Sequence, residues 1–188
     1  MEFKGPGSRT GNRHLTAKIV RACLSMVNNR DGGKVVLGIA EGESGDLVQV
    51  GLTADEVASW QHDHLADTLA EYADPSISFE SQVIEHEGNS YVVIDVHEFP
   101  DIPVLCKKQY QDVLRRGACY VRTRRKPETA EIPTQEDMRD LLDLANEKGV
   151  RKFVTQAYAA GLSVSGQRLP TDEEIFESEI SDFMEGDQ

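Results

Sequence analysis

The chain has 188 residues, a formal net charge of −13 and 39% hydrophobic residues, which is enough for one domain with a core plus an appendage. We expect no membrane span, because no apolar run approaches the roughly 18 residues that a span needs, and no export signal, because residues 1–8 contain no apolar signal region. Three cysteines without a Cys-x-x-Cys pair argue against a disulfide framework and a structural zinc site, and favour a reducing, cytoplasmic location.

The first predicted elements are a short strand at residues 2–4 and a helix that ends near Val27. Residues 5–12 between them are rich in glycine and are expected to form a connecting loop. The helix is indicated by apolar residues at three- and four-residue spacing: Leu15, Ile19, Ala22, Cys23, Met26 and Val27. Gly32 and Gly33 then supply the positive-φ conformations and close approach of a tight turn into a buried strand at residues 35–37.

The middle of the chain predicts strands around one long helix. A strand is expected at residues 47–52, followed by a capping box at Thr53 and Glu56 that opens a helix reaching about Tyr72. Two alternating runs at residues 77–84 and 91–96, joined through Gly88, are typical of a β-hairpin.

The last predicted elements are two short strands, a capped helix and an acidic tail. The strands are expected at residues 104–106 and 118–123. The helix is capped by Thr134 and is expected to end at Gly149, with a short second helix at residues 153–160 and a linker at 163–170. Residues 171–188 contain eight acids and no base, which allows either an amphipathic helix that contacts a partner or solvated disorder.

Most of the basic residues lie in two short segments. Residues 1–34 hold seven Lys or Arg against two acids, and residues 107–126 hold eight against one. Residues 35–106 carry fifteen acids and no Lys or Arg. If the two basic segments meet in space, they form a basic face on an acidic protein.

The second basic segment suits phosphate binding. Arg122 and Arg124 alternate to one side of an extended chain, and guanidinium groups donate paired hydrogen bonds to phosphate. Tyr110 and Tyr120 lie among these bases and could stack on an exposed nucleobase. The alternative is that the charges only protect an edge strand from aggregation.

Several motifs together resemble the Schlafen-type AlbA-like DNA-binding domain family. They are Glu2-Phe3-Lys4, a helix that ends in Asn29-Arg30-Asp31-Gly32-Gly33, the strand Val36-Leu37-Gly38-Ile39, and Tyr120-Val121-Arg122, and the resemblance covers roughly residues 2–145. We therefore expect an α+β fold, with a mixed, mainly antiparallel sheet and two or three packed helices, plus the acidic C-terminal appendage. The expected domains are residues 1–149 and 150–188.

The resemblance and the basic segments together predict nucleic-acid binding, with DNA as the family's ligand and a role in transcriptional regulation. The phosphate backbone would be held, with little sequence preference, by Lys4, Arg9, Arg13, Arg115, Arg116, Arg122, Arg124 and Lys126. Binding of this kind requires no cofactor. The expected partners are DNA or RNA, without a membrane; a homodimer and a protein partner for the acidic tail are further alternatives.

Two other functions stay open. Eukaryotic Schlafen relatives include endoribonucleases that act on tRNA and rRNA, and by that resemblance Glu2 and Glu41 would be catalytic carboxylates that hold Mg²⁺ or Mn²⁺. The glutamate that would precede Glu2 in such a set is absent from this sequence. The third alternative is a protein-interaction module that uses the acidic residues 35–106 and the tail.

Overall fold

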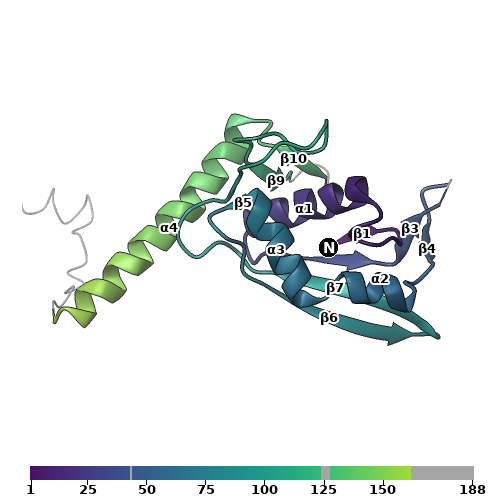
Figure 1. Ribbon diagram of the computed structural model, residues 1–188. Coiled ribbons are helices and arrows are strands. Elements are labelled where there is room, and N and C mark those ends of the chain that lie inside the picture. Colours follow the sequence, from purple (N-terminus) through teal and green to yellow (C-terminus); the bar gives the residue numbers. More distant parts are fainter. Residues whose placement is uncertain (43, 124–127, 162–188) are drawn as a thin grey trace, which may run out of the picture. The chain divides into compact units, whose positions relative to one another are not determined.

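The computed structural model describes residues 1–42, 44–123 and 128–161 of the chain. Its contacts divide the chain into two units, Met1–Val150 and Arg151–Gln188. The first unit has the expected α+β fold, in which a mixed sheet packs against helices (Figure 1). No helix among the described residues is long and apolar enough to cross a membrane.

A four-stranded sheet with the order β1-β2-β7-β6 forms the base of this unit. Its strands are β1 (Glu2–Lys4), β2 (Gly33–Leu37), β6 (Phe79–His86) and β7 (Asn89–Val96). β1 runs parallel to β2, whereas the β2–β7 and β6–β7 pairs are antiparallel. The predicted first strand, buried strand and hairpin are therefore confirmed.

Three two-stranded ribbons complete the β-structure. They are β3 (Ile39–Glu41) with β4 (Leu47–Gln49), β5 (Ala73–Asp74) with β8 (Leu105–Cys106), and β9 (Tyr120–Arg122) with β10 (Thr129–Glu131). The register of the last ribbon sets Thr129 opposite Arg122. This pairing matters for the candidate site because both residues contact the first strand.

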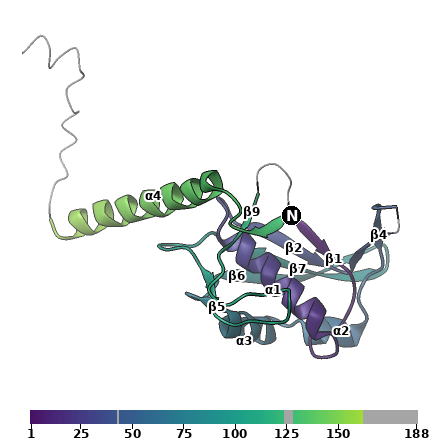
Figure 2. The same cartoon turned by 90° about the horizontal axis from the view of Figure 1, so that it is seen from above.

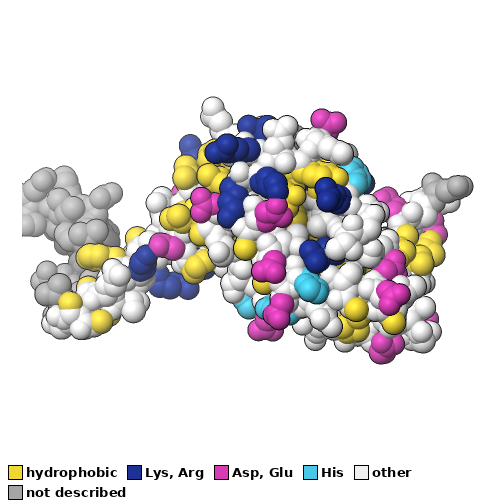
Figure 3. All heavy atoms as spheres, in the orientation of Figure 1, with side chains coloured by type: hydrophobic (Ala, Val, Ile, Leu, Met, Phe, Trp, Pro, Cys, Tyr) yellow, Lys and Arg dark blue, Asp and Glu magenta, His cyan; other side chains and the backbone are white. Residues whose placement is uncertain are grey.

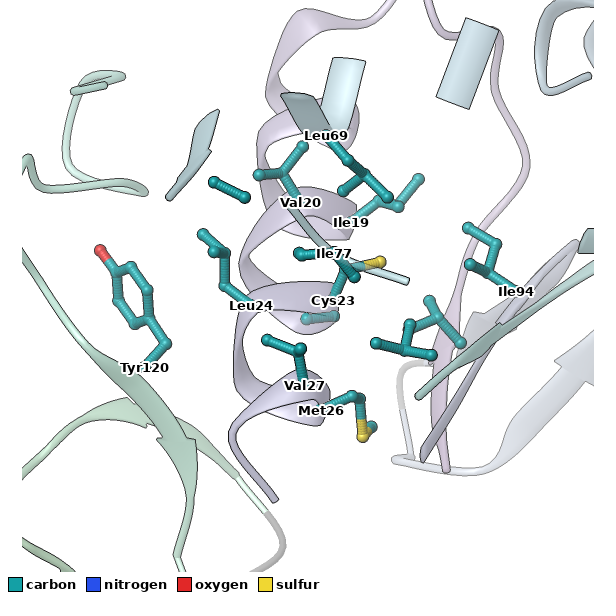
Figure 4. Close-up of a cluster of buried hydrophobic side chains, with 14 of the residues drawn as sticks. Ile19, Val20, Cys23, Leu24, Met26, Val27, Leu69, Ile77, Ile94 and Tyr120 are labelled. Carbon is teal, nitrogen blue, oxygen red and sulfur yellow. The ribbon is translucent and has the colours of Figure 1, made fainter. Parts of the chain in front are cut away.

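Helix α1 (Arg13–Val27) is the centre of the core and lies against one face of the sheet (Figures 1 and 2). The side chain of Asn12 caps it by accepting a hydrogen bond from the N–H of Leu15 at 3.0 Å. The expected apolar residues of the helix are buried, and they pack with Leu69, Ile77, Ile94 and Tyr120 from other elements (Figure 4). The positions of α1 that stay exposed therefore lie on the surface of the whole unit.

The turn between α1 and β2 uses its two glycines for different reasons. Gly32 has a φ of 68°, and a Cβ there would lie 2.0 Å from the carbonyl oxygen of Val96. Gly33 has no positive φ, but a Cβ there would lie 2.2 Å from Sδ of Met26. The second positive φ of the turn, 64°, belongs to Asp31. The expected turn is confirmed, although only one of its glycines is required by the backbone conformation.

The helix predicted over residues 53–72 is wrong in one respect, because it is two helices. α2 (Ala54–Ser59) and α3 (His62–Tyr72) are separated at Trp60 and Gln61. The capping box of Thr53 and Glu56 is present at the start of α2. The indole N–H of Trp60 donates a 2.7 Å hydrogen bond to the carbonyl of Gly7. This long-range contact holds the buried Trp60 where the first helix ends.

The predicted end of the last helix at Gly149 is also wrong. α4 (Gln135–Ala159) continues through this glycine and includes most of the segment expected to form a separate helix. A glycine inside a helix costs only about 1 kcal/mol relative to alanine, so it does not have to end one. The expected cap is present, since the Thr134 hydroxyl accepts from the N–H of Asp137 at 3.1 Å. The expected linker and acidic tail lie outside the described residues.

Candidate nucleic-acid interface

The two basic segments of the sequence meet in space. Helix α1 packs along β9 and β10, so the first basic segment lies against the end of the second. The Arg21 guanidinium carbon lies 5.3 Å from the centroid of the Tyr120 ring, and its Nη2 donates to the carbonyl of Thr129 at 3.2 Å. The condition for a basic face is therefore met in the first unit.

Three of the residues expected to act at the site form one cluster around the Glu2 carboxylate. Nζ of Lys4 lies 2.6 Å from one Glu2 oxygen, and Nη1 of Arg122 lies 2.6 Å from the other. The hydroxyl of Thr129 donates to that second oxygen at 3.0 Å. The side chains of Glu2, Lys4 and Arg122 are only 18%, 19% and 12% exposed. This cluster ties the β9–β10 ribbon to β1, and it engages two of the cations expected to hold phosphate.

The carboxylates expected to hold a divalent metal do not fit such a site. Both oxygens of Glu2 already interact with cations, which a metal ion would have to displace. Glu41 is exposed at the end of β3. Among the described residues, no group of three or more His, Cys, Asp or Glu side chains could hold a metal ion. Mg²⁺ can be held by one or two carboxylates with several waters, but here the Glu2 carboxylate is already engaged by Lys4 and Arg122.

The remaining residues expected from the second basic segment have different surroundings. Arg115 forms an ion pair with Glu131, and its Nε donates to that carboxylate at 2.9 Å. Arg116 is exposed and has no ion-pair partner among the residues that the structure describes. Arg124 and Lys126 lie outside the described residues.

Tyr120 does not have the role expected for it. It is 3% exposed, and its hydroxyl accepts from the backbone N–H of Arg115 at 2.8 Å. A nucleobase therefore cannot stack on this ring without unpacking the core. Tyr110 is only half-buried and lines a hollow that contains bases from both segments.

That hollow brings together the expected residues Arg9 and Arg13 with Lys108. It has a volume of about 530 Å³ and is also lined by Tyr72 and Tyr110. Two further hollows border α1, one lined by Lys18 and Arg21 and the other by Arg21 and Arg115. Bases of the first segment thus recur along the exposed side of α1.

We define the basic band as the six cations that line these hollows, together with their exposed neighbours in the chain Lys107 and Arg116; the six are Arg9, Arg13, Lys18, Arg21, Lys108 and Arg115. Figure 3 shows Lys and Arg side chains gathered where Figure 1 draws α1, β9 and β10, with a few Asp and Glu among them. Within the described part of the chain, only Lys108 and Arg115 of the band pair with a carboxylate, namely with Glu71 and Glu131.

Sequence reasoning missed four members of the band: Lys18, Arg21, Lys107 and Lys108. Lys18 and Arg21 could have been found, because they fall between the apolar positions of the predicted helix and so must face away from its buried stripe. Lys107 and Lys108 carry no such signal. These two residues directly follow β8, and the place of β8 is set by its pairing with β5, which no local sequence pattern predicts.

Comparison with known proteins confirms the family resemblance that the sequence motifs indicated. A family model described as "Schlafen, AlbA_2" matches residues 1–131. No curated protein matches the chain.

Two solved structures are similar to part of the chain. The DIP2311 protein from Corynebacterium diphtheriae is 15% identical with a TM-score of 0.48, over 73% of this chain and 23% of that one. The N-terminal domain of an ATP-dependent DNA helicase RecG-related protein from Nitrosomonas europaea is 25% identical with a TM-score of 0.41, over 61% of this chain and 76% of that one. Because the family model covers well over half of its residues, the chain belongs to the Schlafen AlbA_2 family.

Proposed function

We propose that this protein binds nucleic acid through the basic band, with DNA as its first ligand and a role in transcriptional regulation. Membership of the Schlafen AlbA_2 family points to a nucleic-acid-related function in general. The observation that carries the proposal is the meeting of the two basic segments along α1, on a chain whose net charge is −13. Such segregation gives a local positive potential that the overall charge would not suggest.

The ion pairs divide the basic residues of the two segments into two groups. Lys4 and Arg122 share the Glu2 carboxylate and join the β9–β10 ribbon to β1, so both side chains are already engaged within the fold. Arg13, Lys18 and Arg116 have no carboxylate partner among the described residues, and their charges are available to phosphates. Each phosphate that a cation neutralises releases counterions, which makes the affinity sensitive to salt.

Fluorescence anisotropy of labelled duplex DNA and labelled tRNA tests the proposal, with the protein titrated at about 50 mM and about 200 mM salt. We expect binding that weakens steeply between the two conditions. Absence of binding to either ligand at the lower salt would contradict the proposal. It would instead favour the alternative in which the acidic surface binds a protein partner.

The same assay with Mg²⁺ or Mn²⁺ addresses the nuclease alternative. Because the donor set around Glu2 does not fit a metal, we expect the tRNA to remain intact. Cleavage that disappears in a Glu2→Ala/Glu41→Ala variant would instead assign the activity to these carboxylates. Cleavage that persists in the variant would point to a contaminating nuclease.

A further inference from the structure

The hollow at the start of α1 combines features that the band as a whole does not have. Its lining includes Arg9, Arg13 and Thr68, together with Tyr72, Lys108 and Tyr110, and its volume is about 530 Å³. A concave site of this size falls within the range of about 300–1,000 Å³ that is usual for small-molecule pockets. It differs in this respect from a flat surface that only tracks a phosphate backbone.

Arg9 carries a partly buried charge that no carboxylate compensates within the described part of the chain. Its Nε donates to the carbonyl of Ser59 at 3.1 Å, and its Nη1 donates to the Thr68 hydroxyl at 3.2 Å. Both acceptors are neutral. They fix the orientation of the guanidinium without cancelling its charge, and a half-buried charge is stabilised by an anion that completes its hydrogen bonds.

The rest of the lining keeps the hollow positive. Arg13 has no ion-pair partner among the residues described, and Glu71, the one acid in the lining, pairs with Lys108. Three cations therefore face a single carboxylate. This excess is the reverse of the −13 charge of the whole chain. Phosphate suits the site because two guanidinium groups can each donate paired hydrogen bonds to its oxygens.

Two tyrosine rings provide an aromatic wall beside these cations. Nζ of Lys108 lies over one face of the Tyr72 ring, 5.4 Å from the ring centroid. Tyr110 is held by backbone hydrogen bonds in both directions with Leu114, at 2.9 and 3.1 Å. These bonds fix the backbone from which the ring projects, and a half-buried aromatic ring is the kind of platform on which nucleobases stack.

We propose that this hollow binds one nucleotide, with its phosphate on Arg9 and Arg13 and its base against Tyr110. The inference deepens the proposed function and rests on it, because the band would lead a strand to this hollow. The nucleotide can come from two sources, either a free mononucleotide or an unpaired nucleotide of a longer strand. The two share the recognised chemistry, a phosphate next to an aromatic base.

Isothermal titration with adenosine 5′-monophosphate, adenosine and inorganic phosphate tests the site directly. We expect the mononucleotide to bind more tightly than either of its parts. Arg13→Gln should weaken this binding by roughly tenfold or more, given the strength of hydrogen bonds between charged groups. Tyr110→Leu should weaken it as well, whereas Tyr110→Phe, which keeps the ring, should not. Lys34→Gln removes one positive charge on another part of the unit, where Lys34 pairs with Asp95, and is the control for the change in net charge.

Arg13 is exposed, so its variant is expected to fold, and circular dichroism checks this for each protein. The inference would be overturned if two results came together. The first is that the mononucleotide does not bind, or binds equally well to Arg13→Gln. The second is that a single-stranded overhang does not make a duplex bind more tightly. A duplex with a short single-stranded overhang, compared with a blunt duplex, supplies this second arm. Stacking of one base predicts at least about fivefold tighter binding of the overhang.

The outcomes separate the two sources and the two proposals. Binding of the overhang without binding of the mononucleotide would assign the hollow to a nucleotide within a strand, and tight mononucleotide binding would assign it to the free ligand. Salt-sensitive duplex binding, with no mononucleotide binding and no tighter binding of the overhang, would support the proposal for the basic band and contradict only the proposal for the hollow. Mononucleotide binding without any duplex or tRNA binding would support the hollow and contradict the band.

Discussion

The side-chain amide of Asn28 forms hydrogen bonds with both backbone groups of Val104. Its Nδ2 donates to the Val104 carbonyl at 2.8 Å, and its Oδ1 accepts from the Val104 N–H at 2.8 Å. The same Nδ2 lies 3.0 Å from the carbonyl of Tyr120. Asn28 is 4% exposed and stands at the end of α1. One side chain thus ties the first basic segment to the strands that carry the second.

We expect Asn28→Ala to destabilise the protein by roughly 2–4 kcal/mol, because each buried polar group left without a partner costs about 1–3 kcal/mol. Chemical denaturation followed by circular dichroism measures the change in the free energy of unfolding. Asn146→Ala, at an exposed position of α4, is the control and should have little effect. Equal stability of Asn28→Ala and the parent would show that these bonds do not hold the segments together.

A second prediction concerns the carboxylate that Lys4 and Arg122 share. Glu2→Gln keeps the shape of the side chain but leaves two largely buried cations without their counter-charge. We expect a loss of about 1–3 kcal/mol, which is less than for a fully buried pair because these groups keep some exposure. Glu41→Gln removes the same charge at an exposed site and serves as the control.

Thermal unfolding of the two glutamate variants beside the parent measures the difference. If Glu2→Gln unfolded at the same temperature as Glu41→Gln, the cluster would contribute nothing to stability. Lys4 and Arg122 would then return to the set of cations available to phosphate.

A third prediction is a pH dependence that originates at Glu98. Burial raises its pKa, but hydrogen bonds from Nζ of Lys148 and the N–H of Asp31, with the charges of Lys148 and Arg30, outweigh burial and lower it. A lowered pKa in the folded state stabilises the protein above the unfolded pKa of about 4.3. That stabilisation is lost as the pH falls through the folded value.

Glu98→Gln should therefore be less stable than the parent at pH 7, and the difference should shrink below about pH 4. Denaturation curves at several pH values measure this, with Glu80→Gln as an exposed control on β6. A difference between Glu98→Gln and the parent that stayed constant down to about pH 3 would contradict the assignment.

The fourth prediction is that the cysteines are inert in the folded protein. Burial, with a smaller effect of the Glu2 charge, raises the pKa of the Cys23 thiol to about 12, and burial raises that of Cys119 to about 11. Burial also raises the pKa of Cys106. Since the thiolate is the reactive form, a thiol reagent at pH 8 should label the native protein slowly and the denatured protein at all three cysteines. Fast labelling of the native protein would contradict this packing of the core.

The features that the sequence could predict are those encoded within a few residues. The apolar spacing of α1, the paired glycines after it, the capping box at Thr53 and the N-cap at Thr134 each have a local cause, and the structure contains all of them. The break between α2 and α3 has a cause outside the segment, because Trp60 is held by Gly7. The continuation of α4 through Gly149 reflects a small propensity cost that the rest of the helix outweighs.

The candidate site shows the same limit. The two basic segments were visible in the sequence, but the pairing of Arg122 with Glu2 joins residues 120 positions apart. No local pattern reveals which cations have a carboxylate beside them. The expected residues therefore include cations that already pair with a carboxylate, such as Lys4, and they omit ones that are unpaired among the described residues, such as Lys18.

The central claim is that the uncompensated cations of the basic band hold phosphates, and the salt dependence of duplex binding tests it most directly. Lys18→Gln and Arg116→Gln each remove one exposed charge from the band. Lys34→Gln is the control, because Lys34 pairs with Asp95 and because alternation along β2 directs Val35 to the α1 side and Lys34 to the opposite face of the sheet.

We predict that each band variant lowers the slope of log K against log salt by about 0.9, the value for one phosphate contact, and that Lys34→Gln leaves it unchanged. Equal slopes for the parent and both band variants would contradict the claim that this surface binds nucleic acid.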